Sequence, residues 1–192
     1  MTMSAASKRA PASTKMESYA IGPLKEPRSA QVVRDATTVK FKLPVKLDSF
    51  RALLRTAPLA ERVQIEREGV PYQVVKGLID EIFDSSTEFQ TFVRIPKATF
   101  TKKMRDKSLF AGTTGQSVVG LMELINRVED MLAAERDNEQ ARGFDVEKWV
   151  GEWIQRPQPA LGGLAPADVM DTPTGRASVM RVLGAIQSGA YQ

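Results

Sequence analysis

The chain has 192 residues, 42% hydrophobic and 26% charged, which are ordinary values for a globular protein of one or two domains. It contains no cysteine and no histidine. Disulfides, thiolate nucleophiles, histidine-dependent triads and metal sites built on thiolate or imidazole are therefore excluded. Enzymes can work with carboxylates and lysines alone, but these absences favour a binding protein that is not an enzyme and that carries no metal or cofactor.

Positive charge is concentrated in two regions of the chain, although the net charge is only +4. Residues 1–47 hold nine Lys or Arg against three Asp or Glu, and residues 95–108 hold five against one. Concentrated positive charge favours an anionic partner, most often nucleic acid. A solubilising tail together with one solvated helix face would explain the same pattern.

No segment approaches the roughly 18 consecutive apolar residues of a membrane span. The first residues, MTMSAASKRAPASTK, are basic but lack the apolar stretch of a secretory signal. We therefore expect a soluble, cytoplasmic protein with no membrane partner.

Residues 1–47 form the first predicted region, a flexible basic arm. Its first 37 residues are rich in Ala, Ser, Thr, Lys and Pro, and too few large apolar groups are present to offset the entropy of ordering. Residues 38–46, TVKFKLPVK, alternate apolar and basic side chains. This stretch is either a short edge strand or an extended arm laid on a partner.

From Asp48 onward the sequence predicts helices. Asp48 or Ser49 caps a first helix, Pro58 opens a second that ends at Gly69, and Pro71 opens a third. The side chains expected to face inward are Phe50, Leu53, Leu54, Leu59, Val63, Ile65, Val74, Val75, Leu78, Ile79 and Ile82.

Two short helices and a tight turn are predicted over residues 86–106. Ser86 or Thr87 caps the first helix, and Pro96 disfavours helical geometry before a second helix that runs from Lys97 to Asp106. Phe100 would pack this second helix against the domain. A longer apolar helix follows Thr113 or Thr114, and residues 134–142 read as a linker or a helix end.

This helix pair fits a helix-turn-helix motif, whose second helix presents polar donors to DNA. The candidate DNA-binding residues are Lys97, Thr99, Thr101, Lys102, Lys103 and Arg105. Threonine and lysine are common phosphate contacts. The alternative interpretation is a solvated amphipathic helix in an ordinary bundle.

The composition changes after Gly143. Asp145 caps a helix that contains Trp149 and Trp153, and a Pro- and Gly-rich loop leads through a short helix to a last helix over about residues 174–188. Gly175 at the start of that helix costs roughly 1 kcal/mol relative to alanine, which indicates a close backbone approach. A plain helical hairpin with a frayed tail would also fit the pattern.

The stretch WVGEWIQRPQPALGGLAPADVMDTPTGR, followed by VMRVLGAIQSGAY, resembles the toxin-binding domain of the Xre/MbcA/ParS antitoxin family. The resemblance covers about residues 142–192, and residues 57–134 resemble the family's Xre-like helix-turn-helix more loosely. The family's recognition helix often has two arginines where this chain has Lys102 and Lys103, and lysine lacks the bidentate reading of guanine. The matching positions are Trp153, Pro157, Pro159, Ala160, Leu161, Gly162, Gly163, Pro166, Gly175, Val182, Leu183, Gly189 and Tyr191.

The resemblance implies an all-α antitoxin of a bacterial type II toxin–antitoxin module. Its partner would be a RES-domain toxin that consumes NAD or transfers ADP-ribose, with the antitoxin's tail obstructing the toxin's active site. It also implies a homodimer within a toxin–antitoxin hetero-oligomer that represses its own operon by binding operator DNA. The residues expected to bind toxin are Trp149, Trp153, Leu161, Gly162, Gly163, Arg176, Arg181, Gly189, Ala190, Tyr191 and Gln192.

Three regions follow from these expectations: the arm at 1–47, a helix-turn-helix domain for DNA binding and dimerisation at 48–141, and a toxin-binding domain at 142–192. Two other hypotheses remain open. One is a stand-alone DNA-binding regulator whose C-terminal domain only dimerises. The other is an enzyme, which is the weakest because the chain has no recognised phosphate-binding loop.

Overall fold

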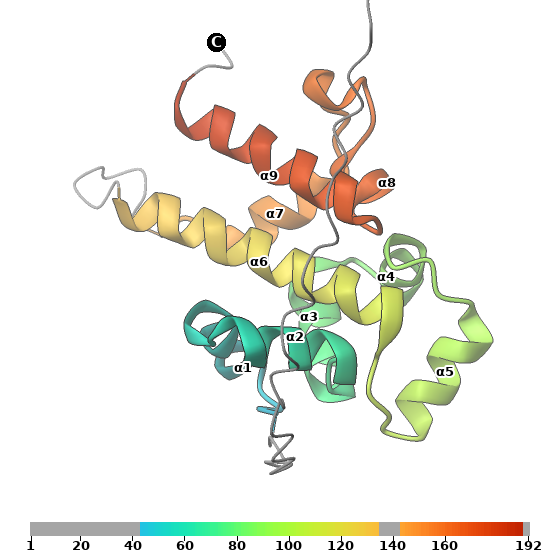
Figure 1. Cartoon of the computed structure of the whole chain (residues 1–192). Helices are drawn as coiled ribbons and strands as arrows, with labels where there is room; N and C mark the ends of the chain where they lie inside the picture. Colours follow the sequence, from blue (N-terminus) through green and yellow to red (C-terminus); the bar gives the residue numbers. More distant parts are fainter. Residues whose placement is uncertain (1–42, 135–142, 190–192) are drawn as a thin grey trace, which may run out of the picture. The chain divides into compact units, whose positions relative to one another are not determined.

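The computed structural model describes residues 43–134 and 143–189, and all of its named elements are helical (Figure 1). The predicted basic arm and most of the linker at 134–142 lie outside the described residues. The helices are α1 (Leu47–Thr56), α2 (Leu59–Glu68), α3 (Tyr72–Ile82), α4 (Ser86–Phe92), α5 (Lys97–Arg105), α6 (Gly112–Ala134), α7 (Val146–Ile154), the 3₁₀ turn η2 (Pro159–Leu161), α8 (Pro166–Val169) and α9 (Pro173–Gln187).

Most predicted helix boundaries are confirmed to within two residues. The predicted cap of α1 is wrong: the helix begins at the buried Leu47 with Lys46 as its N-cap, so Asp48 and Ser49 lie inside its first turn. Pro58 and Pro71 are the N-caps of α2 and α3, and Asp145 caps α7 by accepting a hydrogen bond from the Lys148 amide at 2.9 Å. Small shifts occur at α4, whose cap is Ser85 rather than Ser86 or Thr87, and at α6, which begins at Gly112. Residues 43–46, the described part of the alternating segment, do not form a strand.

The long helix α6 is the centre of the packing. It contacts α1 and α2 on one side and α7 and α9 on another, so Figure 1 shows it running between these groups. Its middle is apolar around the whole circumference, as expected of a helix surrounded by others. The buried side chains include Val118, Val119, Leu121, Met122, Leu124, Ile125 and Val128.

One hydrophobic core continues from Phe50 in α1 to Leu183 in α9, and the described residues from 43 onward belong to one compact unit. The two predicted regions, residues 48–141 and 142–192, therefore share one core, and any division between them is one of function. Leu59 was predicted to face inward, but it is 79% exposed because it occupies the first position of α2. Ile186, an apolar residue near the end of α9, is 36% exposed.

A buried arginine ties the first helix to the C-terminal segment. The Arg51 side chain in α1 is 7% exposed and forms ion pairs with Glu129 of α6 and, at 2.6 Å, with Glu147 of α7. Asn126 of α6 donates a hydrogen bond to the Arg51 carbonyl at 3.1 Å. A buried charge is tolerated only when it is paired in this way, so the network fixes how α7 lies on α1 and α6.

Candidate functional site

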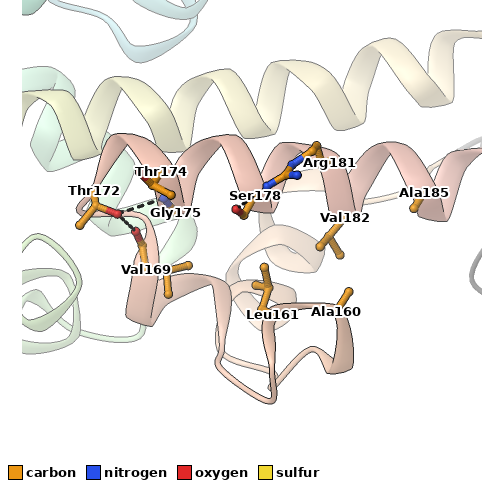
Figure 2. A pocket seen from close by; sticks show the side chains of 10 residues that line it. All are labelled: Ala160, Leu161, Val169, Thr172, Thr174, Gly175, Ser178, Arg181, Val182 and Ala185. Atoms are coloured by element: carbon orange, nitrogen blue, oxygen red, sulfur yellow. Dashed lines mark hydrogen bonds between the residues drawn. The ribbon is translucent and has the colours of Figure 1, made fainter. Parts of the chain in front are cut away.

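A groove of about 580 Å³ runs between α9 and the turn η2. Figure 2 shows Leu161 of η2 pointing toward α9, with Val182 on the opposite wall. Apolar groups form most of its surface, and hydroxyl groups lie at the end nearest α8. The lining residues are Ala160, Leu161, Val169, Thr172, Thr174, Gly175, Ser178, Arg181, Val182 and Ala185.

Thr172 forms the hydroxyl-rich end of this groove and caps α9. Its side-chain oxygen accepts a hydrogen bond from the Gly175 amide and its hydroxyl donates to the Val169 carbonyl, both at 3.0 Å (Figure 2). A Cβ on Gly175 would stand 1.9 Å from that same carbonyl oxygen. The close backbone approach predicted at Gly175 is therefore confirmed, and it brings α8 and α9 together.

Arg181 supplies the positive charge of the groove. It is exposed on α9, and its guanidinium donates a hydrogen bond to the Ser178 hydroxyl at 2.9 Å. The residues that line the groove include no carboxylate. This wall therefore favours a neutral or acidic partner surface.

The Gly162–Gly163 pair shapes the loop on the other side of the groove. Both glycines have positive φ, 68° and 84°, which side chains with a Cβ rarely adopt. The amides of Leu161 and Gly163 both donate to the Gln158 carbonyl, at 2.9 and 3.0 Å. These bonds close the loop on itself, so Leu161 is held in place facing α9.

The two tryptophans differ in their exposure. Trp153 is only 5% exposed and belongs to the core, while Trp149 is half-buried and stacks on it with the ring centroids 5.5 Å apart. Phe144, 39% exposed, lies beside Trp149 with the ring centroids 6.1 Å apart. Trp149 and Phe144 thus present an accessible aromatic surface, and the buried ring of Trp153 packs beneath Trp149.

Arg176 lies away from the groove, against α6. Its side chain covers Gly120, where a Cβ would stand 2.3 Å from the arginine Cδ, and its guanidinium donates to the Met170 carbonyl at 3.2 Å. Nearby, burial raises the pKa of Glu123, and the charges of Arg62 and Arg176 oppose that rise. Gly189 is exposed with φ 69°, and the predicted toxin-binding residues Ala190, Tyr191 and Gln192 lie outside the described residues.

Helix α5 carries a second candidate surface. Ala98, Lys102 and Arg105 follow one another at helical spacing and are exposed, with Thr99 and Thr101 exposed on either side. Lys97 is exposed at the first position of the helix. Phe100 is buried, as predicted, and anchors the opposite face.

Two of the predicted DNA-binding residues have partners within the chain. The Lys103 ammonium donates to the Leu109 carbonyl at 2.8 Å and lies 5.6 Å from the centre of the Phe110 ring. The Arg105 guanidinium donates to Asp106 at 2.9 Å, and this bond lowers the pKa of the Asp106 carboxyl. Lys103 thus holds the end of α5. Arg105 stays exposed beside Asp106, so the open face consists of Lys97, Thr99, Thr101, Lys102 and Arg105.

The sequence analysis did not single out Arg94, in the turn between α4 and α5. Its guanidinium reaches the loop before α9, pairing with Asp171 at 2.7 Å and donating to the Asp168 carbonyl at 2.9 Å. The sequence could not indicate this contact, because 77 positions separate Arg94 from Asp171 in the chain. The two residues meet only because α4 packs near this loop in the fold.

Within the two described stretches, no cluster of three or more acidic residues is arranged to hold a metal ion. None of the helices described is long and apolar enough to cross a membrane. The geometry therefore offers two surfaces for partners, the groove beside α9 and the open face of α5.

Comparisons with known proteins agree with this picture. Residues 144–189, which include every residue lining the groove, match the antitoxin Xre/MbcA/ParS C-terminal toxin-binding domain. The Prs ADP-ribosylating antitoxin of Sphingobium sp. (strain YBL2) is 32% identical over 143 residues, covering 74% of this chain and 87% of that protein. Antitoxin Xre of Photorhabdus laumondii subsp. laumondii is 22% identical over 125 residues, covering 65% and 77%.

Proposed function

The chain belongs to the Xre/MbcA/ParS family of antitoxins from toxin–antitoxin systems, and we propose that it neutralises a RES-domain toxin that consumes NAD or transfers ADP-ribose. One observation carries the proposal: the groove beside α9 lies wholly within the stretch that matches the family's toxin-binding domain. The name of the Sphingobium relative, an ADP-ribosylating antitoxin, supports a toxin with this chemistry.

Toxin docking begins at the groove in this proposal. Leu161 and Val182 offer apolar walls to a toxin side chain, and burying such a group contributes about 1.5–3 kcal/mol. Arg181 at the rim pairs with an acidic toxin residue. The half-buried Trp149 extends the contact, since aromatic residues commonly anchor protein interfaces.

Obstruction of the toxin's active site is assigned to the tail. Residues 189–192, Gly-Ala-Tyr-Gln, carry no charged side chain. A segment without charged side chains can enter a nucleotide pocket without the cost of burying an unpaired side-chain charge. In this role the chain is an inhibitor rather than an enzyme.

Operator binding is the second proposed activity, through the open face of α5. Lys102 and Arg105 project from this face, while Thr99 and Thr101 flank it. Lysine serves phosphates well but lacks bidentate reading of guanine, so Lys102 contributes affinity more than base specificity. A homodimer would place two copies of α5 on one operator and repress the module's own promoter.

Co-expression with the neighbouring open reading frame tests the function directly. The neighbouring gene is induced with and without this protein, while growth and cellular NAD are followed. Toxicity that this protein relieves, with the two proteins co-purifying, is the expected result. Toxicity that it does not relieve would favour a stand-alone regulator whose C-terminal domain only dimerises.

A further inference from the structure

The turn of the helix-turn-helix pair is bound to the segment that matches the toxin-binding domain. Arg94 sits in this turn and pairs with Asp171 at 2.7 Å, and its second contact is the Asp168 carbonyl at 2.9 Å. Asp168 is the acidic residue of the short helix α8. Asp171 immediately precedes Thr172, the cap of α9. One short loop therefore touches both the groove and the α4–α5 turn.

The backbone conformation of Arg94 also indicates that its side chain has a structural role. Its φ is 52°, a left-handed conformation that residues with a Cβ adopt uncommonly and glycine adopts readily. An arginine at such a position gains no advantage in backbone geometry. Its side chain supplies the reason for its presence, through the pair with Asp171.

Asp171 depends on this arginine as its counter-ion. The Asp171 side chain is 20% exposed, and its Oδ1 is buried without a hydrogen-bond partner among the described residues. Arg94 contacts the other oxygen, Oδ2. Without Arg94, a largely covered carboxylate would lose its charged partner, which is unfavourable in a partly buried site.

A parallel contact holds the other end of α4. The side-chain amide of Gln155, just after α7, donates to Glu88 Oε1 at 2.7 Å. The other oxygen of Glu88 accepts from the Asp84 amide at 3.0 Å, next to the N-cap of α4. The C-terminal segment thus contacts α4 at its start and at the turn that leads into α5.

From these contacts we infer that Arg94 and Asp171 are positioning residues for DNA binding. Through this pair, the segment that matches the toxin-binding domain fixes the orientation of α5, although Asp171 itself does not touch DNA. The inference rests on the proposed operator binding, and it adds that the groove-side loop supports the DNA-binding helix.

Asp171→Asn gives a test in which two explanations predict opposite signs. Removing a negative charge would strengthen binding to anionic DNA if only long-range electrostatics mattered. Loss of the positioning pair instead weakens binding, by about threefold to tenfold for an ion pair of this kind. The probe is a labelled duplex of the DNA upstream of the gene, titrated with the full chain.

Glu152→Gln is the matched control. It also exchanges a carboxylate for an amide within the C-terminal segment, but Glu152 is exposed and pairs with Arg156 on the following turn. This control should bind the duplex as the parent does or slightly more tightly. Binding by Asp171→Asn that equals or exceeds binding by the control overturns the inference.

Arg94→Gly separates positioning from a direct phosphate contact. Glycine relieves the left-handed backbone, so the fold is retained. A positioning role predicts weaker binding with an unchanged salt slope, whereas a lost phosphate contact makes the log–log slope shallower by about one. A shallower slope in Arg94→Gly contradicts the inference. A second variant exchanges the two charges, Arg94→Asp with Asp171→Arg, and recovery of DNA affinity in this variant supports the inference.

Hydrogen exchange on the full chain gives a readout that does not need DNA. Asp171→Asn should raise amide exchange in residues 86–105 about threefold to tenfold while leaving α1–α3 unchanged. If the parent does not bind the duplex, the operator proposal fails, and exchange still decides whether the pair positions α5. Unchanged exchange over residues 86–105 overturns the positioning role.

Discussion

Gly175 in α9 lies against the carbonyl oxygen of Val169 in α8, and a Cβ on Gly175 would stand 1.9 Å from that oxygen. Gly175→Ala must therefore push α8 and α9 apart, and we expect a loss of about 1–3 kcal/mol in the free energy of unfolding, as in overpacked cores. Urea denaturation measures this loss.

Gly184→Ala is the control in the same helix, because within the described ranges no atom outside the neighbouring turns of its own helix lies within 4 Å of the Cβ it would add. This variant should be as stable as the parent or gain up to about 1 kcal/mol, since alanine favours a helix over glycine. Equal stabilities for the two alanine variants would show that the close approach at Gly175 has no energetic weight.

Arg181→Glu should weaken toxin binding by at least about tenfold, because like charges facing each other across an interface cost several kcal/mol. Arg181 is exposed and its guanidinium donates to the Ser178 hydroxyl on the same helix, so the fold should persist. Calorimetry with the purified toxin measures the affinity. Lys76→Glu, at an exposed position of α3, makes a similar change of charge outside the groove, and a matching loss there would argue against docking at α9.

Lys102→Ala should lower DNA affinity and make the log–log salt slope shallower by about one, as expected for the loss of one phosphate contact. Lys103→Ala should change the slope little, because the Lys103 ammonium is bound to the Leu109 carbonyl and lies over Phe110. Fluorescence anisotropy at several salt concentrations measures both. A larger slope change for Lys103→Ala than for Lys102→Ala would contradict the assignment of the open face.

Deletion of residues 189–192 should weaken neutralisation of the toxin while leaving DNA binding as in the full chain. The tail is assigned to the toxin's active site, whereas operator binding is assigned to α5 (Lys97–Arg105). Growth rescue on co-expression reports neutralisation, and operator titration reports DNA binding. Complete rescue by the shortened chain would disprove insertion of the tail.

Glu123 should contribute less to the free energy of unfolding as pH rises from 4.5 toward neutrality, because burial raises its pKa in the fold above the ordinary value of 4.5. The folded state binds the proton more tightly than the unfolded state, so ionisation of Glu123 is unfavourable to folding over this range. Glu123→Gln should therefore gain stability relative to the parent as pH rises through this range, in urea melts taken at successive pH values. A profile parallel to that of the parent would mean that Glu123 does not contribute.

Much of the helical fold was predictable from local signals. Proline before a helix, an aspartate cap such as Asp145 and a terminating glycine such as Gly69 act within one turn, so they are readable in the chain itself. The apolar spacing of α3 likewise predicted which face is buried. Leu59 was misjudged because a residue at the first turn of a helix can lie beyond the edge of the packed face.

The sequence by itself predicted a helical chain that resembles the Xre/MbcA/ParS antitoxins and that contains no cysteine or histidine, since caps, periodicity and the PALGG motif are local features. Only the tertiary structure decided which side chains face a partner. It buried Trp153, turned Arg176 onto α6, bound Lys103 to its own loop and paired Arg94 with Asp171. The reason is physical: a side chain's partner is set by which helices pack against each other, and these contacts join residues far apart in the chain.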